Sequence, residues 1–378
     1  MKNILITGGA GFIGSHLSLS LVNQGYKITV LDNLSKQVHG NLPEHSSSLY
    51  MSIKDKVTFI HGDVTNYNDW TIALKDQDAI IHLAAETGTS QSMYEIKKYS
   101  EVNIGGTALM LNHITHNKNR IKKIIVASSR AIYGEGKYYC PDHGIVYPDP
   151  RNDADMAKGD FECKCPSCGH SANLMATTED SRISPTSMYG ITKQCQEQMV
   201  LTICKALNIN AIAFRYQNVY GPGQSLSNPY TGILSIFSTQ IKNNNNIMIF
   251  EDGLESRDFV YIDDVVEATI LGLNANNFGQ YAINVGSDKP ISVFTVAETL
   301  IKNYISEVRI NISGNYRLGD IRHNYADLST ISNKLGFIPK VGFEQGIAKF
   351  CEWVNTQDVM KDCLLESIDE LKSKGLFK

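Results

Sequence analysis

The chain has 378 residues, of which 42% are apolar and 20% charged, and its formal net charge is −4. This composition is typical of a globular protein with one large α/β unit or two closely joined lobes, and it gives no reason to expect a nucleic-acid partner. No apolar stretch is long enough to cross a membrane and no signal-peptide pattern opens the chain. We therefore expect a cytoplasmic protein whose eight cysteines are reduced or metal-bound.

The N-terminal segment predicts a dinucleotide-binding turn. An apolar run at residues 4–6 is typical of a buried strand, and a helical pattern opens at Ser15. Between them lie Gly8, Gly9, Gly11 and Gly14, which let the backbone and a helix N-terminus approach a pyrophosphate. The next apolar run, 28–31, ends at Asp32, whose carboxylate would accept from an adenosine ribose hydroxyl and repel a 2′-phosphate. This favours NAD over NADP, although Lys36 nearby could weaken the preference.

Strand-like and helix-like segments alternate through the first half of the chain. Predicted strands lie at 4–6, 28–31, 57–61, 79–83, 123–127 and 210–216, and predicted helices at 67–74, 99–116 and 187–207. We interpret residues 33–55 as a polar loop. This alternation indicates an α/β fold with a Rossmann-type, doubly wound parallel sheet. Because ligands bind at the carboxyl ends of such strands, the residues that follow the strands should converge on one crevice.

The domain prediction has two parts. Residues 1–216 are expected to form the dinucleotide-binding domain, with a cysteine-rich insert at 137–181. Residues 217–378 should mainly form a smaller mixed α/β lobe for the substrate, with about 259–286 returning to the first domain. The last twenty residues predict a peripheral amphipathic helix.

A candidate catalytic pair lies at the start of the predicted helix 187–207. Tyr189 and Lys193 are one helical turn apart and share a face. A neighbouring cation lowers the pKa of a phenol, so the pair can act as a general base towards an alcohol. The same spacing also occurs on solvated helix faces. Here it follows both the glycine-rich turn and Ser129, which favours the catalytic interpretation.

Motifs over nearly the whole chain resemble the extended short-chain dehydrogenase/reductase family, and in particular its nucleotide-sugar epimerase and dehydratase branch. They are Gly8-x-x-Gly11-x-x-Gly14, Asp32-Asn33, Gly62-Asp63-Val64, His82-Leu83-Ala84-Ala85, Asn103-x-x-Gly106, Ser128-Ser129, Tyr189-x-x-x-Lys193, Asn218 to Gly223, and Arg257 to Val265. The cysteine-rich insert and the C-terminal tail lie outside the resemblance.

The resemblance implies a role for each matching residue. Ser129, Tyr189 and Lys193 would be catalytic, with Tyr189 as the proton-transferring base. The NAD site would comprise Gly8, Gly11, Phe12, Ile13, Gly14, Asp32, Asn33, Asp63, Val64, Leu83, Ala84, Ala85, Asn103, Tyr189 and Lys193. The nucleotide-sugar site would comprise Ser129, Arg130, Asn218, Arg257, Arg317 and Asp320. The arginines offer a planar fork of donors to a diphosphate, although surface ion pairs remain an alternative for each.

The residues after Ser129 bear on the reaction. In 4,6-dehydratases of this branch an Asp-Glu pair follows the Ser/Thr position, whereas here Arg130 and Ala131 do. Without the two carboxylates, the resemblance implies an NAD-dependent 4-epimerase, an isomerase with a 4-keto intermediate. Segments 91–94, 228–232 and 319–323 are similar to a subgroup that interconverts dTDP-L-rhamnose and dTDP-6-deoxy-L-talose. The alternatives are a UDP-hexose 4-epimerase, a 4,6-dehydratase, a 4-keto reductase, and a non-enzymatic dinucleotide sensor.

The insert contains two similar knuckles that predict a metal site. Cys140-x-x-His143 and Cys165-x-x-Cys168 each place two ligands three positions apart, beside Pro and Gly. Three Cys and one His form a closed, structural zinc site. Cys163 or His170 could replace His143, and a metal-free loop is the alternative.

A homodimer is the remaining expectation. In this family the helix with Asn103 and the helix with Tyr189 pair across a dimer. Apolar side chains at Ala108, Leu109, Leu111, Met199 and Val200 are compatible with that packing, and equally with packing on the sheet.

Overall fold

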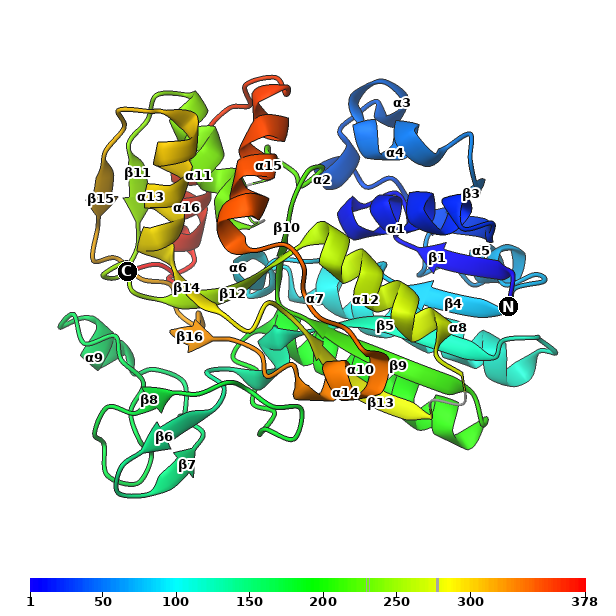
Figure 1. The fold of residues 1–378 in the computed structure, drawn as a ribbon, viewed down its shortest axis with the longest axis horizontal. Helices are drawn as coiled ribbons and strands as arrows, with labels where there is room; N and C mark the ends of the chain where they lie inside the picture. The colour runs from blue at the N-terminus through cyan, green and yellow to red at the C-terminus, as the bar shows by residue number, and fades with distance from the viewer. Residues whose placement is uncertain (229, 231, 277–278) are drawn as a thin grey trace.

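The computed structural model describes residues 1–228, 230, 232–276 and 279–378, so Pro229 and Thr231 of the predicted 228–232 motif lie outside the described residues. Its centre is a parallel sheet of seven strands in the order β3-β2-β1-β4-β5-β9-β13 (Figure 1). The strands are β1 (Asn3–Thr7), β2 (Lys27–Asp32), β3 (Thr58–His61), β4 (Ala79–His82), β5 (Lys123–Ser129), β9 (Asn210–Tyr216) and β13 (Gln280–Val285). This order confirms the predicted Rossmann-type fold.

Helices cover both faces of this sheet, and the strands bury side chains on each side. In β1, Ile4 and Ile6 belong to one hydrophobic core, whereas Leu5 between them belongs to the other. The two cores arise because successive side chains of a strand point to opposite faces. One face is covered by α1 (Phe12–Asn23) and α12 (Ile262–Asn274), and the other by α5 (Tyr67–Ala73), α8 (Gly106–His116) and α10 (Met188–Ala206).

Two predicted segments differ from the structure. The polar loop expected at 33–55 contains three short helices, α2 (Lys36–His39), α3 (Pro43–Ser46) and α4 (Ser48–Ile53). The helix expected at 99–116 is divided into α7 (Ile96–Tyr99), the π-helical η1 (Ser100–Gly105) and α8. The π-helical turn contains the buried Asn103, and such turns are frequent at functional sites.

The second lobe is mixed, and part of its sequence returns to the first. Strands β10 (Asn218–Tyr220), β12 (Ser256–Tyr261), β14 (Pro290–Ser292) and β16 (His323–Asn324) form one small sheet, and β11 (Ile247–Ile249) pairs with β15 (Ile310–Ile312). The helices are α11 (Ile233–Lys242), α13 (Val293–Tyr304), α14 (Ser329–Leu335), α15 (Phe343–Asn355) and α16 (Leu364–Ser373). Between these elements, α12 and β13 pack on and join the large sheet.

The insert has a core of its own. Strands β6 (Tyr138–Cys140), β7 (Gly144–Val146) and β8 (Asn173–Leu174) form an antiparallel sheet, and α9 (Asp153–Met156) lies between β7 and β8 in the sequence. Buried Tyr138, Val146 and three of the cysteines pack together there. The insert protrudes beneath the second lobe in Figure 1.

The C-terminal helix is present as α16, but the prediction that it is peripheral is wrong. Leu364, Ser367 and Leu371 of α16 line the main pocket of the protein. The apolar stripe in the sequence indicates that one face of this helix is buried. The surface that this face covers is formed by elements that are distant in the sequence. Across the part of the chain that the structure describes, no helix has the length and apolar character to cross a membrane.

Candidate active site

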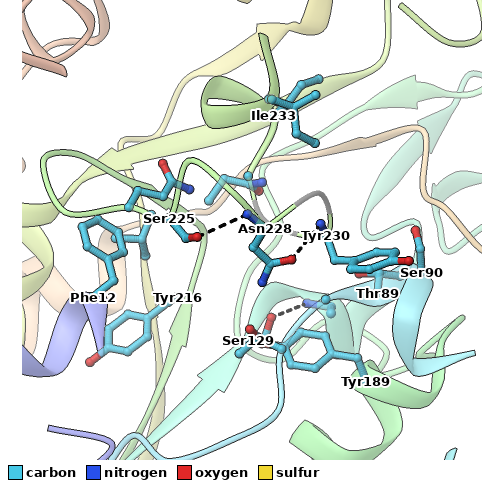
Figure 2. Close-up of a pocket in the computed structure, with 18 of the residues that line it drawn as sticks. Phe12, Thr89, Ser90, Ser129, Tyr189, Tyr216, Ser225, Asn228, Tyr230 and Ile233 are labelled. Atoms are coloured by element: carbon cyan, nitrogen blue, oxygen red, sulfur yellow. Dashed lines mark hydrogen bonds between the residues drawn. The ribbon is translucent and has the colours of Figure 1, made fainter. Parts of the chain in front are cut away.

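A pocket of about 580 Å³ lies where the carboxyl ends of the large sheet meet the second lobe. Its wall includes the glycine-rich turn at one end, Ser129 and Tyr189 in the middle, and residues of β11 and α16 at the other end. Figure 2 shows Ser129 and Tyr189 on one wall, with Asn228 and Tyr230 above them. The predicted convergence of strand ends on one crevice is therefore present in the structure.

The glycine-rich turn fits the phosphates of a dinucleotide. Gly8 has a φ of +66°, and a Cβ built there would lie 2.8 Å from the backbone nitrogen of Ala84. A Cβ on Gly14 would lie 2.2 Å from the carbonyl oxygen of Gly8, so the turn and helix α1 pack without room for side chains. Gly11 precedes α1 and makes no side-chain cap, and the first residues of this helix line the pocket. A helix N-terminus exposed in this way binds anions.

Asp32 stands at the end of β2 and lines the same part of the pocket. One carboxylate oxygen accepts a 2.9 Å hydrogen bond from the Ala10 amide, and the other accepts one of 2.9 Å from Leu34. Each oxygen keeps a further lone pair that can accept from a ribose hydroxyl. The carboxylate would repel a 2′-phosphate, and Lys36 is outside the described residues that line the pocket.

Four of the predicted cofactor-binding residues lie outside the described pocket lining: Asn33, Asp63, Val64 and Asn103. Asn33 donates a 2.8 Å hydrogen bond to Asp63, beside the lining residue Asp32. Asn103 accepts a 2.7 Å hydrogen bond from the Glu86 amide and donates one of 2.9 Å to Thr192. In this structure Asn103 therefore joins the loop after β4 to the helix that contains Tyr189.

The structure brings Ser129, Tyr189 and Lys193 into one pocket. Ser129 ends β5, and Tyr189 lies in the first turn of α10, where its amide donates a 2.9 Å hydrogen bond to Ser92. Lys193 is one turn further along, and its Nζ donates to the Ala127 carbonyl at 2.9 Å. The same Nζ lies 5.9 Å from the centre of the Tyr189 ring.

The electrostatics of this group involve a second cation. Burial raises the pKa of the Tyr189 phenol, while a hydrogen bond with Ser129 and the charge of Arg130 act in the opposite direction. Burial lowers the pKa of Lys193 to about 7. Burial and the charge of Arg257 lower the pKa of Arg130 to about 9, so its guanidinium remains charged at neutral pH. Arg130 is therefore a charge that favours the Tyr189 phenolate, in addition to the expected Lys193.

Cations continue towards the second lobe. Arg257 donates to Asp320 at 3.1 Å and to the Ile321 carbonyl at 2.7 Å. Arg317 lies over the Phe250 ring at 4.6 Å, and its buried Nε has no hydrogen-bond partner among the residues that the structure describes. Arg130, Arg257 and Arg317 all line the pocket, as do the predicted Asn218 and Asp320. This arrangement can hold a diphosphate.

Several described lining residues were not predicted from the sequence. They include Glu255, Tyr230, Leu364, Ser367 and Leu371. Burial and neighbouring Glu251 raise the pKa of Glu255 to about 8. Tyr230 belongs to the segment 228–232 that resembles a substrate subgroup, and the amphipathic pattern of 364–371 was visible in the sequence, but neither signal indicated that these side chains line the pocket.

The four predicted metal ligands of the insert also come together. The ligand atoms of Cys140, His143, Cys165 and Cys168 all lie within 4.8 Å of one another. The Cys140 sulfur is 3.6 Å from Nδ1 of His143 and 3.7 Å from the Cys168 sulfur, and the Cys165 sulfur is 3.7 Å from the same Nδ1. A tetrahedral zinc ion with Zn–S of about 2.3 Å and Zn–N of about 2.1 Å has ligand–ligand edges of about 3.6–3.8 Å.

The two alternative ligands are not part of this group of four, although the ligand atom of His170 lies within 4.8 Å of the Cys168 sulfur. The thiol of Cys163 donates to Glu135 at 3.3 Å, and His170 lies 3.7 Å from Asp142. All eight cysteines are free.

The doubly wound sheet, the glycine-rich turn with Asp32, and the Ser129, Tyr189 and Lys193 group define a dinucleotide-dependent enzyme of the short-chain dehydrogenase/reductase type. Within that class, the chain belongs to the NAD dependent epimerase/dehydratase family, whose sequence model matches residues 4–158 and 166–286. The unmatched interval 159–165 lies within the insert.

Individual relatives are similar over nearly their whole length. The chain is 36% identical to a dTDP-L-rhamnose 4-epimerase of Burkholderia thailandensis over 358 residues, which cover 93% of this chain and 95% of that protein. A solved UDP-glucuronic acid 4-epimerase from Bacillus cereus, in complex with UDP-glucuronic acid and NAD, has a TM-score of 0.76 and 27% identity, covering 93% of this chain and 99% of that one. A UDP-N-acetylglucosamine 4-epimerase from Methanobrevibacter ruminantium has a TM-score of 0.75 and 28% identity, covering 94% and 99%.

Proposed function

We propose that this protein is an NAD-dependent nucleotide-sugar 4-epimerase, an isomerase. The observation that carries the proposal is that Ser129, Tyr189 and Lys193 share one pocket with the glycine-rich turn and with three arginines, Arg130, Arg257 and Arg317. This arrangement suits a cofactor and a diphosphate-linked sugar that meet at the phenol of Tyr189. The similarity to sugar-nucleotide 4-epimerases supports the same assignment.

Each of these residues would have a distinct role in the reaction. When bound, NAD supplies a reversible store for the hydride of sugar C4. Tyr189 takes the proton of the C4 hydroxyl and later returns it, and Ser129 orients that hydroxyl by a hydrogen bond. Lys193 holds the nicotinamide ribose, and Arg130 favours the phenolate form of Tyr189. Arg257 and Arg317 hold the diphosphate, so that the oxidised sugar can rotate to present its other face without leaving the pocket.

The carboxyl groups of the pocket favour epimerisation over dehydration. Those on the described lining are Asp32, at the cofactor end, and Glu251, Glu255 and Asp320, which belong to the arginine-rich end. The positions after Ser129 hold Arg130 and Ala131, so the acid and base of a 4,6-elimination are absent from that segment.

For the substrate we propose dTDP-L-rhamnose and dTDP-6-deoxy-L-talose. The relative from Burkholderia thailandensis, a dTDP-L-rhamnose 4-epimerase, supports this choice. The UDP-sugar complexes of the structural neighbours keep a UDP-hexose 4-epimerase as the second candidate.

The test is incubation of the purified protein with dTDP-L-rhamnose, UDP-glucose and UDP-N-acetylglucosamine, followed by NMR of the sugar protons. We expect the C4 epimer of the dTDP sugar to form without net consumption of reduced cofactor. Release of a 4-keto sugar would instead indicate a dehydratase, and net oxidation of NADPH a reductase. No reaction with any 4-hydroxy sugar nucleotide would overturn the proposal.

We also propose that Cys140, His143, Cys165 and Cys168 hold a structural zinc ion. The agreement between their separations and the edges of a zinc tetrahedron supports this assignment. Four protein ligands leave no position for a substrate, so the ion would stabilise the insert rather than take part in the reaction.

We further propose a cytoplasmic homodimer. The eight free cysteines suit a reducing compartment. In the described chain Leu111 and Val200 are buried against the sheet, whereas Leu109 and Met199 are only partly buried. The latter two are therefore the candidates for a dimer contact, which light scattering of the purified protein would test.

A further inference from the structure

The C-terminal segment 364–378 covers one end of the pocket. Leu364, Ile368 and Leu371 of α16 and Phe377 after it are nearly fully buried and form a separate small hydrophobic cluster. Met248 and Phe250, in and after β11, pack against this cluster. Ile236 of α11 also packs against the cluster, and Figure 1 shows α16, in red, in the second lobe. The segment lies beyond residue 286, where the match to the family ends.

The last residues of the chain also hold Arg317. The Tyr316 amide donates to the Lys378 carbonyl at 2.8 Å, and the Leu318 amide donates to the Leu376 carbonyl at 3.1 Å, so that Arg317 pairs with Phe377 between them. The Arg317 guanidinium lies over the Phe250 ring, and this ring packs edge-on against the Phe377 ring with the two ring centroids 5.0 Å apart. The position of this guanidinium therefore depends on the C-terminal residues.

Two tyrosines from other segments also hold α16. Tyr94 donates a 2.9 Å hydrogen bond to Tyr230, and Tyr230 donates to Glu370 of α16. Tyr230 itself lines the pocket. The helix is thus joined to Tyr230 as well as to β11.

The order of sugar, diphosphate and nucleoside in a nucleotide sugar indicates which part of the substrate would lie next to α16. With the sugar at Ser129 and Tyr189 and the diphosphate at Arg257 and Arg317, the nucleoside must continue past the arginines. The pocket lining contributed by α11, by α16, and by β11 with the residue after it is mostly apolar and includes Ile236, Met248, Phe250, Leu364 and Leu371, with Ser367, while Tyr230 and Glu251 are polar residues nearby. A planar pyrimidine base that carries a methyl group at one edge suits such a wall, because burial of the methyl group against apolar side chains is favourable.

We propose that residues 364–378 form the nucleobase wall of the substrate site and select a thymine base over uracil. This inference rests on the proposed function, since it takes the ligand to be a pyrimidine nucleoside diphosphate. Leu364 and Leu371 of the helix border the pocket and pack against Met248 and Phe250, so they support the apolar wall that would face the base. The residues after it hold Arg317 at the diphosphate.

The first experiment measures calorimetric binding of dTDP, dUDP and UDP to the NAD-loaded protein. The pair dTDP and dUDP differs only in the base methyl group, so we expect dTDP to bind about fourfold more tightly than dUDP, the ratio that one buried methyl gives. Equal affinity for dTDP and dUDP would overturn the thymine preference. Binding of dTDP without turnover of any sugar nucleotide would sink the proposed epimerase and leave this inference standing.

The second experiment compares two Leu→Ala substitutions on the same helix. Leu371 lines the pocket and is 2% exposed, whereas Leu365 is 62% exposed. We expect Leu371→Ala to weaken dTDP binding about tenfold and Leu365→Ala by less than about twofold, with NAD affinity unchanged in both. Leu371→Met, which keeps the apolar volume, should restore binding. Unchanged dTDP affinity in Leu371→Ala, or an equal loss of NAD affinity, would overturn the assignment.

Discussion

Arg130, which directly follows β5, donates a 2.8 Å hydrogen bond from Nε to Oδ1 of Asn218 in β10, and both residues line the pocket. The guanidinium interacts electrostatically with the Tyr189 phenol and with Arg257. It therefore contributes charge both to the phenol of Tyr189 and to the proposed diphosphate site. Lys193, the expected partner of Tyr189, is desolvated and has a pKa lowered to about 7.

Replacement of this cation should change the pH dependence of the reaction. Loss of a nearby positive charge disfavours the phenolate, so Arg130→Met should raise the pKa of Tyr189 and move the acidic limb of the pH–rate profile to higher pH. If the pKa of Tyr189 rises by about 1, kcat/KM at neutral pH should fall about tenfold. Arg130→Lys should restore part of the wild-type profile.

The measurement is kcat/KM between about pH 6 and 10 for the three proteins. The other groups that act on or beside the phenol are Ser129, Lys193 and Tyr99, and these remain in both variants. A profile that falls in height without moving along the pH axis would show that Arg130 only binds substrate.

Removal of the Tyr189 hydroxyl should abolish proton transfer while the fold is kept. We expect Tyr189→Phe to reduce kcat by about 10²–10⁴-fold, because a general base is lost, and to leave NAD affinity nearly unchanged. The matched control is Tyr139→Phe, at a half-exposed position in the insert, which should retain activity. Substantial turnover by Tyr189→Phe would contradict the proposed base.

The charge of Asp32 should decide between the two dinucleotides. In Asp32→Asn one oxygen can still accept from a backbone amide, but the repulsion of a 2′-phosphate is lost. We expect weaker NAD binding, stronger NADP binding, and a fall of about tenfold or more in the NAD/NADP affinity ratio. Titration with each dinucleotide measures this ratio, with Asp55→Asn, at an exposed position, as the control. An unchanged affinity ratio would mean that a group other than Asp32 discriminates between the 2′-hydroxyl of NAD and the 2′-phosphate of NADP.

The insert should contain one zinc ion per chain. Cys168→Ser removes one of the four ligands, so we expect it to lose the metal and to melt at a lower temperature than the wild type. Cys363→Ser, outside the insert, should keep both the metal and the melting temperature. Elemental analysis and calorimetry measure the two properties. Zinc-free protein from a zinc-containing medium would contradict the assignment.

Local sequence patterns determined much of the fold and the middle of the pocket. The glycine-rich turn, Asp32 and the Tyr189–Lys193 pair each lie within one or two adjacent elements, so spacing along the chain fixes their geometry. The alternation of strands and helices likewise predicted the parallel sheet, because connections of this kind admit few topologies. By contrast, the short helices between Lys36 and Ile53 were missed, because four to six residues show no helical period.

The tertiary structure decided the contacts that join distant parts of the chain. The sequence predicted His143 as a metal ligand and left Cys163 as a possible replacement. In the structure the Cys163 thiol donates to Glu135, 28 positions earlier, so only the tertiary structure separates the two. The stripe of Leu364, Ile368 and Leu371 predicted a one-sided helix, while its place over the pocket depends on β11 and Tyr230. The sequence period specifies which side of a helix is buried, whereas the surface that buries it is specified by long-range packing.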